Sequence, residues 1–146
     1  ETNCLQLPQT LTAMDLKAKQ QKIFNTQLEP YIELHLQSPG GSLMPTFYVC
    51  DTIRNLDTPV YTYVDGFCAS AASLISVCGK KRYMTAHSAI LIHQLSSAAT
   101  GKLNEIKAEV DNLTFFMNHV KDIYLKTTNI EKDKLDELLG MEIWMD

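Results

Sequence analysis

Two adjacent glycines follow a strand-like run in the stretch YIELHLQSPGG, and a helix-like run comes straight after them. The alternation of apolar and polar residues over 31–37 predicts a half-buried strand, and residues 43–56 predict a helix. Adjacent glycines occur where a chain must adopt positive φ or let another group approach its backbone closely. A strand, a glycine turn and a helix N-terminus also expose backbone N–H groups that can bind an oxyanion or a phosphate.

The rest of the chain continues this alternation of strands and helices. Further strands are predicted over 59–64, 82–86 and 89–93, and further helices over 10–27, 66–79, 101–127 and 130–139. Strands that alternate with helices indicate an α/β fold whose strands are mostly parallel. We find no internal repeat and no linker, so the sequence predicts a single domain over residues 1–146.

The helix over about 101–127 is longer than a domain of this size needs for its own core. Its apolar residues recur at spacings of three and four from Leu103 to Tyr124. At ~1.5 Å per residue such a helix is roughly 40 Å long. The pattern fits a packed core helix, and it fits equally well a helix that serves in part for contacts between subunits.

Composition and charge exclude several classes of protein. The net charge of −4 argues against nucleic acid as a partner, since phosphate binding depends on patches of Lys and Arg. No apolar run approaches the ~20 residues of a membrane span, and the N-terminus shows no signal-peptide pattern. The histidines have no metal-ligand spacing, so we expect no metal site. The cysteines offer no site for a cofactor, and we expect none. Four cysteines without CxxC pairing indicate reduced thiols in a cytoplasmic protein: Cys4, Cys50, Cys68 and Cys78.

The stretch DGFCASAAS holds the candidate nucleophile. A strand that runs into Gly66 and a helix that starts a few residues later would place Ser70 or Ser73 near a helix N-terminus. This is the arrangement of a nucleophile elbow, although the GxSxG spelling is absent, and serines in such a helix also serve as packing residues. His93 ends the strand over 89–93 and is either a general base or a core residue. Cys68 paired with His93 is a thiol alternative.

Four motifs in sequence order resemble those of ClpP, the proteolytic-subunit family of the Clp protease. That family typically reads INSPGG, YDTM, GQAAS and MIHQ, and this chain reads LQSPGG over 36–41, CDTI over 50–53, GFCAS over 66–70 and LIHQ over 91–94. The resemblance extends over about 31–146 and implies an α/β fold of the crotonase/ClpP-like type with a long handle helix. The divergence from the usual spelling suits a bacteriophage-encoded member.

The resemblance implies the roles of the site residues. Ser70 becomes the nucleophile of a serine endopeptidase and His93 the base, with the backbone N–H groups of Gly41 and Ala71 as the oxyanion hole. The strand before the paired glycines and the segment 95–102 would bracket an extended peptide by β-pairing. The family further implies an ATP-dependent peptidase of unfolded proteins, in heptameric rings stacked as a tetradecamer through the handle helix and served by an AAA+ unfoldase. It would act in the cytoplasm, the host's if the gene is viral.

The chain departs from the family at the third catalytic residue. Leu138 stands where an aspartate should orient the histidine, which leaves Asp136 or Glu142 as nearby acids and Asp133 further back. Two alternatives to a working peptidase follow. One is a weak or inactive ring subunit that binds an unfoldase or host subunits. The other is an acyl-CoA enzyme of the same fold, against which the IHQ motif and the serine at position 70 argue.

Overall fold

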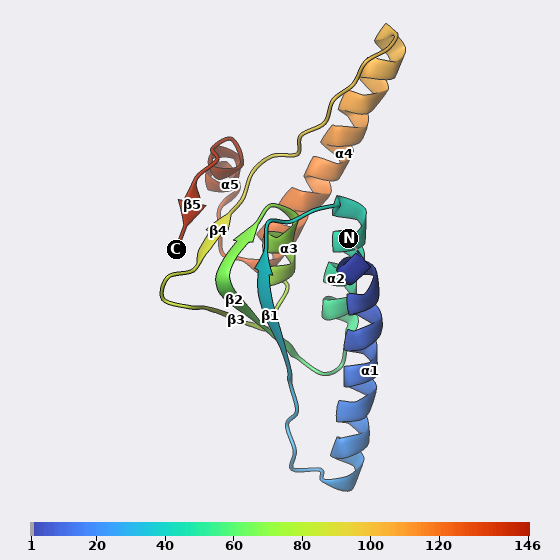
Figure 1. Cartoon of the computed structure of the whole chain (residues 1–146), viewed down its shortest axis with the longest axis vertical. Coiled ribbons are helices and arrows are strands. Elements are labelled where there is room, and N and C mark those ends of the chain that lie inside the picture. Colours follow the sequence, from blue (N-terminus) through green and yellow to red (C-terminus); the bar gives the residue numbers. More distant parts are fainter. Residues whose placement is uncertain (1) are drawn as a thin grey trace. The chain divides into compact units, whose positions relative to one another are not determined.

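The computed structural model describes residues 2–146, with side chains from Leu5 onward (Figure 1). The chain divides into two compact units. The first comprises the residues up to Leu91 together with Trp144–Asp146, and the second comprises Ile92–Ile143. The candidate nucleophile therefore belongs to the first unit and the candidate base to the second.

The first unit contains a five-stranded sheet. Its strands are β1 (Ile32–Ser38), β2 (Val60–Ala69), β3 (Lys81–Met84), β4 (Ala89–Leu91) and β5 (Trp144–Met145). β1, β3 and β4 all pair with β2 in parallel, and β5 pairs with β4 in antiparallel orientation. The prediction of an α/β fold with mostly parallel strands is confirmed, and the short antiparallel β5 was not predicted.

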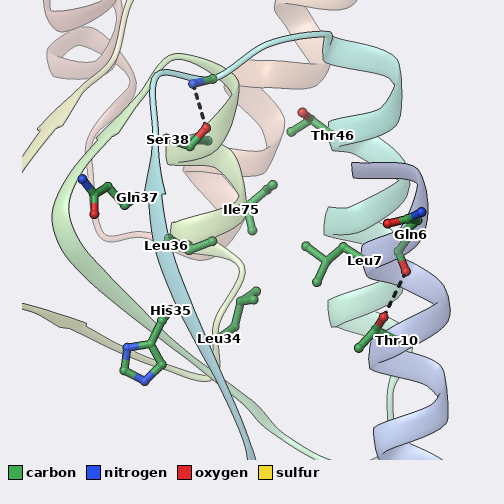
Figure 2. A pocket seen from close by; sticks show the side chains of 12 residues that line it. Gln6, Leu7, Thr10, Leu34, His35, Leu36, Gln37, Ser38, Thr46 and Ile75 are labelled. Carbon is green, nitrogen blue, oxygen red and sulfur yellow. Dashed lines mark hydrogen bonds between the residues drawn. The ribbon is translucent and has the colours of Figure 1, made fainter. Parts of the chain in front are cut away.

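Three helices complete the first unit: α1 (Thr2–Phe24), α2 (Leu43–Asn55) and α3 (Ala71–Val77). The predicted alternation along β1 is seen directly, because Leu34 and Leu36 point toward the helices while His35 and Gln37 point away from them (Figure 2). The core of the unit contains buried aliphatic side chains from the sheet and the helices: Ile32, Val49, Ile53, Val60, Val64, Leu74 and Ile75.

The N-terminal helix differs from its prediction over 10–27, since α1 begins before Pro8 and ends at Phe24. Buried side chains pack this helix against the rest of the unit, and Pro8, in the part that was not predicted, is among them. Leu11 is 1% exposed, and the buried carboxylate of Asp15 accepts a hydrogen bond of 2.8 Å from the backbone N–H of Thr58. Lys19 pairs with Asp15 one helical turn away. The bond from Thr58 joins residues that are 43 positions apart in sequence, so local propensity does not report it.

The predicted helix over 66–79 was wrong in its first part. The chain stays in β2 as far as Ala69, and α3 occupies only Ala71–Val77, with Cys78 rather than Gly79 at its cap. Gly66 adopts φ 97°, beyond which residues 67–69 pair with β4. Intrinsic propensity is overridden here by tertiary context, because hydrogen bonding to β4 decides the conformation of residues 67–69.

The second unit consists of α4 (Leu103–Thr127) and α5 (Lys132–Leu139). The predicted long helix is confirmed, and its exposure changes along its length: Leu103 is 66% and Val110 56% exposed, whereas Val120 is 4% exposed. The helix starts where the backbone N–H of Lys102 donates to the carboxylate of Glu105 at 2.8 Å. The half of α4 nearer its start therefore carries apolar side chains that are open to solvent.

The cysteines that the structure describes are free thiols, namely Cys50, Cys68 and Cys78, all buried. The side chain of Cys4 lies outside the described residues. Over residues 2–146, none of the helices has both the length and the apolar character that crossing a bilayer requires.

Candidate active site

Ser70 occupies the junction between β2 and α3 in a conformation that serine rarely adopts. Its backbone has φ 54° and ψ −128°, and among the described residues no other non-glycine residue has positive φ. Its N–H donates to the carbonyl of Leu91 at 2.9 Å, and its own carbonyl accepts from the N–H and the hydroxyl of Ser73 at 3.0 and 2.5 Å. Such a conformation carries a strain energy of roughly 1–3 kcal/mol, and it persists where contacts with the surrounding structure maintain it. A strained serine between a strand and a helix is the backbone form of a nucleophile elbow.

The glycine turn after β1 packs directly against this serine. A Cβ atom built on Gly40 would lie 2.6 Å from the carbonyl oxygen of Ala69 and 2.8 Å from the Cβ of Ser70, and Gly40 has φ 97°. Its N–H donates to the hydroxyl of Ser38 at 3.1 Å (Figure 2). A Cβ atom on Gly41 would meet nothing within 4 Å. Gly40 is therefore required by packing, while Gly41 presents its backbone to open space.

Sequence reasoning selected Gly41 and Ala71 as oxyanion donors and missed the part played by Gly40. Ala71 is the first residue of α3 and is 5% exposed. The N–H groups at the start of a helix have no acceptor within it. The paired glycines were the signal for Gly40. Both have positive φ, at 97° and 155°, but the contact with Ser70 shows that a side chain at Gly40 would also clash.

The alternative nucleophiles are inaccessible. Ser73 and Cys68 are both 0% exposed, whereas Ser70 is partly exposed. Burial raises the pKa of the Cys68 thiol to about 11, so this thiol is protonated at neutral pH. Of these three side chains, Ser70 is the one that a substrate can reach.

A cavity of about 410 Å³ in the first unit adjoins the glycine turn. Figure 2 shows its lining from β1, from Gln6, Leu7 and Thr10 of α1, and from Ile75 of α3. Ser38 and Gly40 also line it. The turn that contacts Ser70 is thus bounded on one of its sides by open space rather than by packed side chains.

His93 belongs to the second unit, where it follows β4 by two residues and is half-buried. Its Nδ1 lies 2.6 Å from the backbone carbonyl oxygen of Gln94. The N–H of Gln94 donates in turn to the carbonyl of Leu139, the last residue of α5, at 2.9 Å. The structure therefore brings Gly40, Ser70 and Ala71 together in the first unit and gives His93 a partner within the second.

The acids near the end of α5 differ in their surroundings. The carboxylate of Asp136 pairs with Lys121 of α4 at 2.7 Å. Glu142 is exposed, and Leu138, at the position where the resemblance expects an aspartate, is partly buried. Among the described side chains, no group of three His, Cys, Asp or Glu residues is arranged to hold a metal ion.

The sheet, its covering helices and the strained serine at a strand-to-helix junction define an α/β protein. Residues 11–146 match the Clp protease family. Because this match covers more than nine-tenths of the sequence, the chain belongs to the Clp protease family. The resemblance seen in the four motifs, and the fold expected from it, are confirmed.

Curated relatives agree with this assignment. The chain is 32% identical over 114 residues to the ATP-dependent Clp protease proteolytic subunit 1 of Chlamydia pneumoniae, which covers 75% of this chain and 60% of the relative. The proteins of the same name in Chlamydia caviae and Protochlamydia amoebophila are 31% and 30% identical, with 60% and 55% of their lengths covered. The chain thus spans about 60% of the length of the first of these relatives.

Proposed function

We propose that this chain is a serine endopeptidase subunit of the Clp type that hydrolyses peptide bonds of unfolded proteins. Ser70 is the nucleophile, His93 the general base, and the N–H groups of Gly41 and Ala71 the oxyanion donors. The observation that carries the proposal is the strained backbone of Ser70 at the end of β2. Such strain persists where the surrounding structure maintains it, and it clusters at active sites.

The chemistry follows from these roles. The Oγ of Ser70 attacks the peptide carbonyl carbon while Nε2 of His93 takes the hydroxyl proton. The tetrahedral oxyanion binds the two N–H groups, and a donor of this kind is worth about 100- to 1,000-fold in rate. His93 then protonates the leaving amine, and water, activated by His93, hydrolyses the acyl-enzyme.

The proposed assembly encloses these sites in a chamber built from heptameric rings stacked as a tetradecamer. The exposed apolar side chains on the first half of α4 support it, because side chains such as Leu103 and Val110 are expected to be buried between subunits. A closed chamber admits only unfolded chain, so an AAA+ unfoldase would deliver substrates. The relatives are named as ATP-dependent, which supports this part of the proposal.

A second candidate function is a ring subunit with little or no activity that binds an unfoldase or other subunits. The observation that favours it is Leu138, which provides no carboxylate where the family pattern expects one. Loss of the orienting acid can cost on the order of 10⁴ in rate when the histidine adopts the wrong tautomer.

Labelling with a fluorophosphonate separates the two candidates. We expect the 146-residue chain to be labelled at Ser70, as located by peptide mass spectrometry, and to hydrolyse a short fluorogenic peptide. Ser70→Ala should lose both signals. Ser88→Ala, which removes a hydroxyl bonded only locally to Thr85, should keep both within roughly two-fold. Assembled rings that resist labelling would refute the peptidase and leave the inactive subunit.

A further inference from the structure

The hydrogen bond between His93 and Gln94 determines which ring nitrogen carries the proton. A carbonyl oxygen only accepts hydrogen bonds, so at 2.6 Å from that oxygen Nδ1 is the protonated nitrogen. In the neutral ring, Nε2 then bears the free lone pair. This is the tautomer that a general base needs in order to take a proton from a serine through Nε2.

We propose that the backbone carbonyl of Gln94 positions the His93 imidazole, in the role that an aspartate carboxylate has in a Ser-His-Asp triad. The inference rests on the proposed function, because it assigns a positioning group to the same base. It names an atom of the backbone rather than a side chain, so the identity of residue 138 does not matter to it.

The carbonyl of Gln94 is held in place by the end of α5. The N–H of Gln94 donates to the carbonyl of Leu139 at 2.9 Å, and Leu139 is 4% exposed. The last carbonyls of a helix have no partner within it, so this bond satisfies one of them and anchors the Gln94 backbone on the N-terminal side of its Cα. A series of two hydrogen bonds therefore joins the buried end of α5 to Nδ1 of His93.

The neighbouring carboxylates are poorly placed to compete for this role. Asp136 is engaged by Lys121 at 2.7 Å, and breaking that pair would be needed before it could turn to another partner. The side chain of Glu142 is exposed, so it would lose conformational entropy if it were fixed against His93. Nδ1 already has a short bond to Gln94, so neither acid is needed to select the tautomer.

A neutral acceptor differs from a carboxylate in one respect. Both orient the ring and select the tautomer, but only a carboxylate adds charge that stabilises the imidazolium formed during attack. We therefore expect a rate below that of a full triad and well above that of a histidine left in the wrong tautomer.

The tautomer can be read directly from the ring nitrogens. Nuclear magnetic resonance of the chain labelled with ¹⁵N-histidine gives signals from both ring nitrogens, and the His93→Gln variant identifies those of His93. Spectra recorded at alkaline pH report the neutral ring. We expect protonated Nδ1 and unprotonated Nε2. A ring with protonated Nε2 would overturn the inference, whether or not Ser70 reacts, so its failure is distinguishable from that of the proposed function.

The role of the carbonyl is tested by replacing the amide between residues 94 and 95 with an ester, which makes the carbonyl of Gln94 a weaker acceptor. We expect the ring to shift toward protonated Nε2 and the labelling rate of Ser70 to fall about five- to thirty-fold. The matched control is an ester between residues 95 and 96, which should change neither signal. An unchanged tautomer and labelling rate in the first ester would overturn the inference.

The competing acids are tested with Asp136→Asn and Glu142→Gln. Both variants should keep the tautomer of His93 and the labelling of Ser70. If either one shifts the ring to protonated Nε2, that carboxylate rather than the carbonyl of Gln94 holds the base, and the inference is wrong.

Discussion

A Cβ atom at Gly40 would lie 2.8 Å from the Cβ of Ser70, so the glycine turn after β1 and the strained serine after β2 are in direct contact. Real Cβ atoms do not approach so closely, and the same Cβ would lie 2.6 Å from the carbonyl oxygen of Ala69. The contact joins two segments thirty residues apart and maintains the position of the proposed nucleophile.

Gly40→Ala should therefore damage both stability and the site. We expect the free energy of unfolding to fall by about 2 kcal/mol, from positive φ and overpacking together, and labelling of Ser70 to be lost. Urea unfolding and fluorophosphonate labelling measure the two effects. Gly140→Ala is the matched control, because Gly140 has helical φ of −79° and its nearest Cβ contact would be 3.4 Å. Equal behaviour of the two variants would contradict the packing argument.

The strained backbone of Ser70 predicts that replacing this serine by glycine raises the stability of the fold while it abolishes the reaction. Ser70→Gly and Ser70→Ala should both abolish labelling, yet Ser70→Gly should be more stable by about 1 kcal/mol, since only glycine adopts φ 54° without strain. Thermal and urea unfolding compare them. At Ser88, which lacks positive φ, the order should reverse, with the alanine variant the more stable. A less stable Ser70→Gly would show that the backbone is unstrained.

The buried carboxylate of Asp15 predicts a loss of stability in acid. Burial alone would raise the pKa of Asp15, but the bonds from Lys19 and Thr58 outweigh it and hold this pKa below its usual value. A depressed pKa in the folded state means that the stabilisation is present above about pH 4 and is lost as the pH falls through the folded value. Asp15→Asn should cost about 2 kcal/mol at pH 7 and much less near pH 2.

Urea unfolding across this pH range tests the linkage. The exposed Asp111→Asn serves as the control and should leave the free energy of unfolding nearly unchanged at both pH values. A cost of Asp15→Asn that stays constant from pH 7 to pH 2 would mean that the ionised carboxylate does not stabilise the fold.

The exposed half of α4 is the surface through which the proposed assembly would form. Leu103→Glu combined with Val110→Glu should weaken assembly on the order of 100-fold, because two apolar side chains would lose their burial. Sedimentation velocity measures the oligomer, and far-ultraviolet circular dichroism checks that α4 still folds. Asn104→Glu with Asn112→Glu adds the same charge to the same helix at polar positions and should assemble normally. Equal assembly of the two double variants would place the interface elsewhere.

Much of the fold and part of the site could be predicted because those features are local. The alternation along β1, the apolar repeat of α4 and the order of the four motifs lie in short windows, and each reports its own element. The motifs were enough to identify the family and to select Ser70 as the candidate nucleophile. The sequence also predicted that Ser70 lies where a strand meets a helix, and in the structure it lies between the end of β2 and the start of α3.

Only the tertiary structure decided the features that depend on distant partners. β2 continues to Ala69 because residues 67–69 pair with β4, and Asp15 of α1 accepts a hydrogen bond from Thr58, which lies 43 residues further along the chain. Gly40 must lack a side chain because Ala69 and Ser70 lie against it, whereas Gly41 has open space around it and only its positive φ favours glycine. Hydrogen bonds and van der Waals contacts between segments more than twenty residues apart leave no periodicity in the sequence. The sequence alone therefore determined most of the elements and the candidate residues for chemistry, and packing determined how the serine is held.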